Sequence, residues 1–271
     1  RRHRETTRVW PERDDKILCD WNGFMIRALT HAGATFNQPQ WFDTAKACYE
    51  TLKSNLWRGD KLIHTMCNGQ TGPHGFLEDY ASLALAALDL FAFGGHGPYL
   101  EDAKALYALM EKNFSLENGL FSQTEGDMEN LITRPIPIYD QATPSGNAMV
   151  SEVLVKLAIY CHGSGYDEKA AALFTALSST MSKNSFGVPT LLNAYDLYLN
   201  AIEIRLIDAQ DGRADYFKNL LWAHLPAHAV VQTISAPDHA ASHIVICRHQ
   251  RCSLPLQNEE DILHMLETLE P

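Results

Sequence analysis

The sequence is short of basic residues. It has 22 Lys and Arg against 33 Asp and Glu, which gives a formal net charge of −11 over 271 residues. Nucleic acids and anionic membranes are polyanions that attract positive charge, so this balance argues against either as a partner. One basic cluster stands at the start of the chain, where a solvated linker is expected; it comprises Arg1, Arg2, Arg4 and Arg8.

Long apolar runs are also missing. The best candidate for a membrane span, residues 81–93, is shorter than the ~18–20 residues that cross a bilayer, and it contains Asp89. No segment has the pattern of a secretory signal. We therefore expect a cytoplasmic protein with no membrane partner.

Several signatures of catalysis do not occur. The chain has no H-E-x-x-H, no G-x-S-x-G, no P-loop and no dinucleotide fingerprint. Zinc peptidase, serine hydrolase, NTPase and Rossmann functions therefore lack support. No set of metal ligands has the spacing of a zinc site. The sequence predicts neither a metal nor a cofactor.

The six cysteines include no C-x-x-C pair. Cys48 and Cys161 fall inside apolar helical patterns, and a chain of this length needs no disulfides, so we expect reduced thiols in a cytosolic or organellar compartment. Cys247 and Cys252 are a separate case. The residues between them could lower a thiol pKa, but a structural role at a hairpin is the commoner outcome; they include Arg248, His249 and Arg251.

Apolar residues recur at helical spacing from Trp21 to Ala201, interrupted by loops that contain glycine and proline. The helix expected at 77–92 is apolar on most of its circumference, which is typical of an inner helix, whereas the helix at 99–113 is amphipathic and suits an outer layer. The expected helices are 20–36, 41–57, 77–92, 99–113, 145–162, 166–183 and 189–201.

The second helix of each pair begins with the same pattern of aromatic, any residue, acid, any residue, alanine. It occurs at Trp41–Ala45, Tyr99–Ala103 and Tyr166–Ala170, about 60 residues apart. The acid falls in the first turn, where it complements the helix dipole. Periodic helical hairpins stack into solenoids or close into toroids, so the expected fold class is mainly α, an (α/α) toroid of hairpins.

The pattern changes to strands near the end of the chain. Strands are expected at 204–207, 229–234 and 243–247, with a helix at 211–222 that makes the first two parallel, and a helix at 259–269 closes the chain. This predicts a small α/β appendage to the helical body.

Three segments follow from these patterns: a linker at 1–19, the helical-hairpin portion at 20–202 and a small α/β segment at 203–271. A closed toroid of six hairpins needs more helices than this chain supplies, so about two hairpins or more would lie upstream of Arg1. An incomplete toroid exposes inner-helix surface, and a dimer could cover it.

Three clusters of polar and acidic residues each precede or open an inner helix. Stacked hairpins place the starts of these helices at one end of the molecule, so we expect the clusters to converge there. The members are Asp14, Asp15, Trp21 and Asn22 in the first cluster, Glu78, Asp79 and Tyr80 in the second, and Asp140, Ser145 and Asn147 in the third.

The carboxylates of the second and third clusters are the catalytic candidates. Glu78 and Asp79 are adjacent, so a helix points them about 100° apart and only one can face a cavity squarely. Capping and the helix dipole would favour the same acids without any chemistry. Asp140 could complete an acid–base pair with either of them, or it could form a turn.

Other members are candidates for binding a substrate. An aromatic beside an amide, as in Trp21 and Asn22, is a common way to stack on a polyol ring and hydrogen-bond it, although a buried Trp and a capping Asn give the same pattern. Asp14, Asp15, Asp20 and Asn22 are more polar groups than one helix start needs. His64 titrates near neutral pH and could act as a base. The remaining candidates are Tyr80, Ser145 and Asn147.

Four motifs together resemble a known family. They are Asp14-Asp15-Lys16-Ile17-Leu18 with Trp21-Asn22-Gly23-Phe24-Met25-Ile26, then Leu77-Glu78-Asp79-Tyr80-Ala81, Pro144-Ser145-Gly146-Asn147, and Cys247 to Cys252 with Pro255. Over essentially its whole length the chain resembles the C-terminal part of the YyaL-type, spermatogenesis-associated, thioredoxin-domain-containing proteins.

The resemblance implies a six-hairpin glycosidase-like toroid, related in fold to the N-acylglucosamine 2-epimerases, that binds ligands in a funnel at the N-terminal ends of its inner helices. It also implies an N-terminal thioredoxin-like domain outside this chain. No pair of histidines here matches the epimerase base positions.

Together these observations predict a carbohydrate-processing or carbohydrate-binding protein. The reaction would be epimerisation, isomerisation or hydrolysis of a neutral or N-acyl sugar by carboxylate acid–base chemistry. The alternative is a non-catalytic toroid that acts as a scaffold or redox partner for the thioredoxin-like domain, with the polar clusters serving as helix caps.

Overall fold

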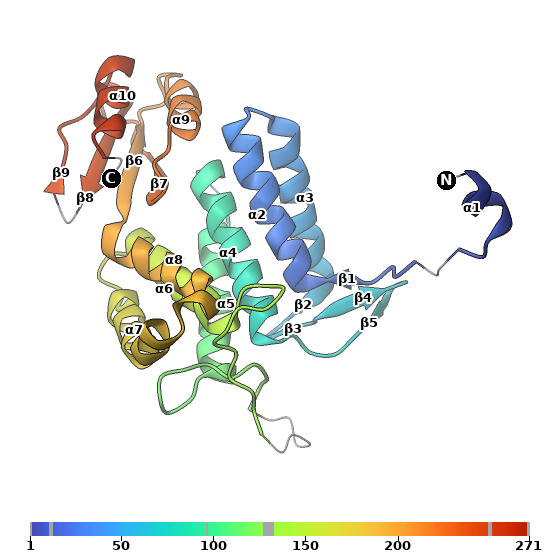
Figure 1. Cartoon of the computed structure of the whole chain (residues 1–271). Helices are drawn as coiled ribbons and strands as arrows, with labels where there is room; N and C mark the ends of the chain where they lie inside the picture. Colours follow the sequence, from blue (N-terminus) through green and yellow to red (C-terminus); the bar gives the residue numbers. More distant parts are fainter. Residues whose placement is uncertain (1, 11–12, 96, 127–132, 249–250, 270–271) are drawn as a thin grey trace.

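The computed structural model of the chain describes residues 2–10, 13–95, 97–126, 133–248 and 251–269. Its largest part is a body of helical hairpins (Figure 1). Each predicted helix is present within a few residues of its expected bounds, which confirms the mainly α, toroid-type fold class. The helices are α2 (Cys19–Thr35), α3 (Pro39–Leu56), α4 (Leu77–Gly94), α5 (Tyr99–Phe114), α6 (Gly146–Tyr160), α7 (Tyr166–Lys183) and α8 (Pro189–Asn200).

Helix α4 is the centre of this body. Nearly every side chain from Leu77 to Ala92 is buried, and the helix packs against α2, α5 and α6. Outer helices such as α5 and α7 instead bury one face and leave the other in water. A helix that is apolar all round has to be enclosed by neighbours, so the composition of α4 fixes its inner position.

A network of buried charges ties the three inner helices together. The guanidinium of Arg27 in α2 lies 2.8 Å from Asp89 in α4 and 2.5 Å from Glu152 in α6. Lys156 in α6 lies 2.6 Å from Asp89 and 3.0 Å from Glu152. Although burial alone would raise it, the charges of Lys156, Arg27 and His31 hold the pKa of Asp89 well below its usual range. Each buried charge therefore has an opposite partner, as the low polarity of an interior requires.

The C-terminal segment is a four-stranded sheet with strand order β7-β6-β8-β9. β6 (Ile202–Asp208) and β7 (Ala229–Ser235) are parallel, and α9 (Ala214–Ala223) lies between them in the chain, as the sequence predicts. β8 (His243–Arg248) is antiparallel to β6, and β9 (Arg251–Cys252) pairs with β8. α10 (Glu259–Glu267) follows the sheet.

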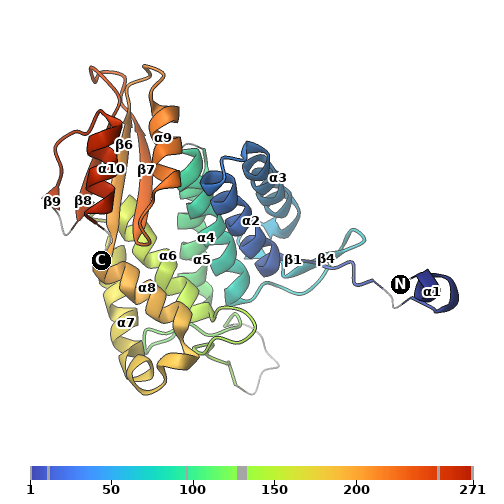
Figure 2. The same ribbon diagram turned by 45° about the horizontal axis from the view of Figure 1, so that its top comes forward.

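The sheet lies close to the helical body because of one glycine. Gly95 follows α4 with a φ of 72°, and a Cβ there would come within 2.7 Å of the Thr233 side chain of β7. A residue without Cβ suits both the left-handed backbone and the close approach. Figure 2 shows the sheet and α9 beside the ends of α2 and α4.

Short strands that the sequence did not indicate lie beside the starts of α2 and α4. They form two small sheets, β1 (Ile17–Leu18) with β4 (Thr65–Cys67) and β5 (Gln70–Thr71), and β2 (Trp57–Arg58) with β3 (Lys61–Leu62). These sheets carry the loop that contains His64. A short 3₁₀ helix, η1 (Ser185–Gly187), precedes α8.

The N-terminal segment contains one short helix, α1 (Arg2–Thr7), that buries no residue. It stands apart from the body in both views (Figures 1 and 2). Arg1, the first member of the expected basic linker, lies outside the described residues. Among the residues that the structure describes, no helix combines the length and apolar character needed to span a membrane.

The expectation of reduced thiols does not hold for the pair of cysteines that the sequence set apart. Cys247 and Cys252 form a disulfide, while Cys19, Cys48, Cys67 and Cys161 are free. The physical reason is register, because the β8–β9 hairpin places Cys247 directly opposite Cys252. His249, which lies between the two cysteines, is outside the described residues.

Candidate functional site

The starts of α2, α4 and α6 lie at one end of the helical body, and a hollow of about 260 Å³ opens between them. The first turns of α2 and α4 form part of its wall, and the chain that leads from α5 to α6 forms much of the rest. The lining residues are Asp20, His64, Phe76, Glu78, Asp79, Gln123, Pro137, Tyr139, Gln141, Thr143, Pro144 and Ser145.

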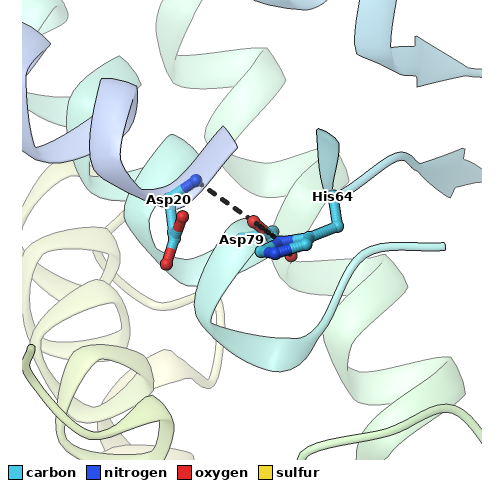
Figure 3. A group of neighbouring side chains, drawn as sticks. All are labelled: Asp20, His64 and Asp79. Carbon is cyan, nitrogen blue, oxygen red and sulfur yellow. Dashed lines mark hydrogen bonds and ion pairs between the residues drawn. The ribbon is translucent and has the colours of Figure 1, made fainter. Parts of the chain in front are cut away.

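A histidine–carboxylate pair stands in this wall (Figure 3). His64 Nδ1 lies 3.0 Å from Oδ1 and 2.9 Å from Oδ2 of Asp79. The Asp79 carboxylate also accepts hydrogen bonds from the backbone N–H groups of Phe76 at 2.7 Å and Asp20 at 3.1 Å. With both oxygens engaged and the residue fully buried, Asp79 holds the starts of α2 and α4 and the His64 ring in place.

The electrostatics of the pair favour a charged imidazole. The hydrogen bond to Asp79 raises the pKa of His64 above its ordinary value, against the opposing effect of partial burial. The Phe76 ring packs edge-on to His64, with ring centroids 5.0 Å apart. The orientation of His64 is therefore set by one polar and one aromatic contact.

Glu78 is the most perturbed acid in the hollow. Burial is the main cause that raises the pKa of its carboxyl to about 7, and the nearby charges of Asp79 and Asp20 add to the effect. Its Oε2 is buried and has no hydrogen-bond partner among the described residues. A carboxyl that holds its proton near neutral pH can serve as both a proton donor and a proton acceptor.

The close approach of α6 keeps Glu78 in this environment. A Cβ on Gly146, the first residue of α6, would lie 2.6 Å from Leu77 Cδ2 and 3.2 Å from Glu78 Oε1. Only glycine allows this contact, so α6 can pack directly on the first turn of α4. Ser145 caps α6, because its Oγ accepts a hydrogen bond from the Ala148 N–H at 3.3 Å.

Asp20, which the sequence places in the first polar cluster but not among the candidate site residues, is a third carboxylate of the hollow. It lies in the first turn of α2, lines the hollow and accepts a hydrogen bond from the Trp21 N–H at 2.8 Å. One ligand atom from each of Asp20, His64 and Asp79 lies within 4.8 Å of the others, so these three residues could hold a metal ion. Because Asp79 and His64 already bind each other, Asp20 would be the least encumbered ligand.

Four of the sequence candidates line the hollow: His64, Glu78, Asp79 and Ser145. Two more lie next to it but take part in packing. Tyr80 is fully buried, and its hydroxyl accepts from the Leu62 N–H at 2.8 Å and donates to Glu125 at 3.3 Å. Asn147 is also fully buried. Its side chain exchanges hydrogen bonds with the Phe121 backbone and donates to the Pro137 carbonyl.

The third catalytic candidate, Asp140, does not line the hollow. Its two carboxylate oxygens accept hydrogen bonds from the N–H groups of Ser145 and Thr190, each at 2.8 Å. These donors lie at the starts of α6 and α8, where backbone N–H groups lack partners within their own helix. The geometry is that of a double helix cap rather than of a free acid or base.

The first cluster also lies outside the hollow. Asp14 binds Lys16, and Asp15 contacts Arg13, all at the exposed end of the linker. Trp21 is 61% exposed, so its ring is not buried as a core residue would be. Asn22 donates to the Leu18 carbonyl at 2.8 Å.

Several neutral polar and aromatic groups of the hollow come from the chain that leads from α5 to α6. They are Gln123, Tyr139 and Gln141, to which Thr143 adds a hydroxyl. Gln141 and Thr143 belong to the polar stretch between Asp140 and Ser145 that the sequence marks as the third cluster, whereas Gln123 and Tyr139 carry no periodic signal that would place them.

A larger hollow of about 660 Å³ lies between α2, α6, α8 and β7. Its charged lining includes Arg27, Glu152 and Lys156, which are already paired with one another. The smaller hollow holds the unpartnered carboxyl oxygen, and for that reason we place the candidate site there.

No family model matches the chain. Curated relatives do: it is 23% identical to human spermatogenesis-associated protein 20 over 290 residues, which cover 94% of this chain and 36% of the relative. The rat protein of the same name is 24% identical over 298 residues. The chain is a homologue of spermatogenesis-associated protein 20. An uncharacterized protein of Caenorhabditis elegans is 27% identical over 194 residues, which cover 69% of this chain.

These relatives agree with the resemblance that the four motifs carry, to spermatogenesis-associated proteins. The chain covers 36% and 37% of the human and rat proteins, little more than a third of their length. Most of each relative thus has no counterpart in this sequence.

Solved structures confirm the toroid fold. The GH76 α-mannanase of Bacteroides thetaiotaomicron superposes with a TM-score of 0.56 at 12% identity, covering 84% of this chain and 66% of the mannanase. The cellobiose 2-epimerase of Bacillus thermoamylovorans superposes with a TM-score of 0.50 at 15% identity, covering 62% of this chain and 45% of the epimerase. At these identities the likeness is one of fold.

Proposed function

We propose that the hollow at the starts of α2, α4 and α6 binds a sugar and carries out acid–base chemistry on it, with Glu78 as the group that moves the proton. The observation that carries this proposal is the Glu78 carboxyl, whose pKa is raised to about 7 and whose Oε2 has no partner among the described residues. An unsatisfied buried carboxyl is costly for the fold, and perturbed acids gather at functional sites.

The lining fits an uncharged ligand. No lysine or arginine occurs among the described residues that line the hollow, whereas phosphate, sulfate and carboxylate groups are bound by such residues. Gln123, Gln141 and Thr143 offer amides and a hydroxyl for sugar hydroxyl groups, and the half-exposed Tyr139 ring offers a face for C–H stacking. The volume of about 260 Å³ suits one sugar ring more than an oligosaccharide.

The two other acids that line the hollow, Asp20 and Asp79, would have different roles. Asp20 also lines the hollow, and it would act as the base when Glu78 acts as the acid. Asp79 positions His64 and the two helix starts, since its oxygens are already engaged. The names of the mannanase and the epimerase with this fold support sugars as the substrate class. They leave hydrolysis and epimerisation as the two reaction types.

Ligand-observed NMR with a panel of sugars tests the binding step. Neutral aldoses and N-acyl sugars are expected to bind, and sugar phosphates and uronic acids are expected to bind much more weakly. Glu78→Gln and Tyr139→Ala should weaken binding, while Glu117→Gln, the same chemical change at an exposed residue, should not. Equal binding by Glu78→Gln and the wild type across the panel would contradict the proposal.

A second candidate function rests on a different observation. Asp79, Asp140 and Asn147 each satisfy backbone groups, as helix caps and loop anchors do. This favours a non-catalytic toroid that supports a thioredoxin-like domain of a longer protein. That function predicts no sugar binding, and it predicts that substitution of these residues changes the free energy of unfolding alone.

A further inference from the structure

A second chemically distinctive place lies in the C-terminal sheet. A hollow of about 400 Å³ opens beside the Cys247–Cys252 disulfide, and His162, Glu203 and Arg205 line it with the two cysteines. It lies away from the sugar hollow, since the two share no lining residue. Neither the fold nor the proposed sugar chemistry uses it.

The disulfide links residues of different exposure. Cys247 lies in β8 and is 5% exposed, whereas Cys252 lies in β9, the edge strand, and is exposed. The two residues already face each other in the antiparallel ladder. A covalent link between paired neighbours adds little to the alignment of these strands, and it leaves the Cys252 side open to an incoming thiol.

The other thiols indicate the redox setting. Cys48, Cys67 and Cys161 are free and only partly buried. Partly exposed thiols survive where the surroundings are reducing, and disulfides in reducing compartments are mostly transient, catalytic or redox-sensing. A single disulfide beside several free thiols therefore fits an exchangeable bond better than a structural staple.

The charges around the disulfide suit exchange. Glu203 in β6 is paired directly with Cys247, and its negative charge would oppose a thiolate there. Arg205 lies 2.6 Å from Glu203 and His162 lies 3.2 Å from it, so two potential cations stand against that one anion. Arg205 thus offsets the negative charge of Glu203, and a protonated His162 would leave the hollow with a net positive charge, which favours a thiolate.

We propose that Cys247–Cys252 is a thiol–disulfide exchange site that takes two electrons from a dithiol. A thiolate of the dithiol attacks Cys252 Sγ, the Cys252–Cys247 bond breaks, and Cys247 leaves as a thiolate beside Arg205. The second thiol of the dithiol then attacks the first sulfur of the dithiol, which is bonded to Cys252 Sγ in the mixed disulfide. That bond breaks, and Cys252 leaves as a thiolate. The dithiol becomes a disulfide, both cysteines become thiols, and two protons pass from the dithiol to the chain.

Reduction of the folded chain is the first test. The protein is equilibrated with dihydrolipoamide and lipoamide in varied ratio, free thiols are alkylated, and mass spectrometry measures the Cys247 and Cys252 peptides while circular dichroism follows the fold. We expect both thiols to become alkylated with the spectrum unchanged. A bond that opens only when denaturant unfolds the chain would overturn the proposal.

The order of attack is tested with two matched variants. Cys247→Ser keeps the exposed sulfur and Cys252→Ser keeps the buried one, and each is treated with glutathione disulfide in a background of Cys67→Ser. Cys247→Ser should form the mixed disulfide severalfold faster. Equal rates, or a faster Cys252→Ser, would overturn the assignment.

Removal of single charges supplies an independent test. Arg205→Gln should slow reduction by dihydrolipoamide and Glu203→Gln should accelerate it, because the first removes a cation and the second removes the opposing anion. Identical rates in both variants would show that the charges of this hollow do not assist the exchange.

Discussion

His64 and Asp79 make a two-point contact, with Nδ1 of the imidazole 3.0 Å and 2.9 Å from the two carboxylate oxygens. This contact joins the loop after β3 to the first turn of α4, and through the Asp20 N–H it also reaches the start of α2. The convergence of three chain segments on one buried carboxylate is what gives the hollow its shape.

The contact predicts a pH-dependent contribution to stability. The pKa of His64 is raised in the folded chain, chiefly by its hydrogen bond to Asp79. Burial raises the pKa of Asp79, so the charged pair contributes fully between the pH at which Asp79 takes up a proton and the pKa of about 6.5 of an unfolded histidine. The contribution is lost as pH rises through the folded pKa of His64. Between pH 6 and pH 8, the free energy of unfolding measured in urea should fall more for the wild type than for His64→Gln. An equal loss in both proteins would contradict the contact.

The buried Glu78 carboxyl is expected to lower the free energy of unfolding once it ionises. Its pKa is raised, mainly by burial, to about 7, so ionisation disfavours the folded state as pH rises from about 4.3, the pKa of an unfolded glutamate. Glu78→Gln should match the wild type at pH 4 and exceed its free energy of unfolding by about 1–3 kcal/mol at pH 8. Urea titrations at both pH values measure this, with Glu117→Gln as the control. A destabilised Glu78→Gln at pH 8 would show that the carboxylate is a structural group.

Asp140 should behave as a cap and not as an acid or base. Its oxygens accept from the Ser145 and Thr190 N–H groups, so Asp140→Asn should lower the free energy of unfolding by about 1–2 kcal/mol. Sugar binding should be unchanged when the variant is assayed well below its melting temperature. A loss of sugar binding without a loss of stability would return Asp140 to the catalytic candidates.

Arg27 should be essential for the helical body. It bridges Asp89 and Glu152 from α2, and without it the two buried carboxylates have to share the single charge of Lys156. Arg27→Met should cost roughly 3–5 kcal/mol of stability. Arg27→Lys retains the charge but loses the forked geometry, so it should cost less. Thermal unfolding of the two variants measures the difference, and a silent Arg27→Met would show that water screens the network.

The fold was predictable because its signals are periodic. The apolar circumference of α4 and the repeated opening of α3, α5 and α7 are local patterns, and local patterns specify helices and their layers. The same holds for the parallel β6–β7 pair, since a helix between two apolar strands leaves little choice of topology.

The site was predictable only in part, since its geometry depends on contacts distant in sequence. Sequence could place Glu78 and Asp79 at a helix start, but not decide that Asp79 would satisfy Phe76, Asp20 and His64 while Glu78 kept an oxygen free. Nor could the sequence show that the second oxygen of Asp140 accepts a hydrogen bond from the N–H of Thr190, 50 residues away. The disulfide was missed because it depends on a hairpin register that spacing does not reveal.

The most direct test of the account is turnover. Wild type, Glu78→Gln and Glu117→Gln are incubated with aldoses, N-acyl sugars and disaccharides in D₂O, and the anomeric, C2 and C3 protons are followed by NMR. The account predicts deuterium at C2 or new sugar signals with the wild type and Glu117→Gln, and a loss of about 100-fold or more with Glu78→Gln. Unchanged sugars with every protein, or equal turnover by Glu78→Gln, would contradict acid–base catalysis by Glu78.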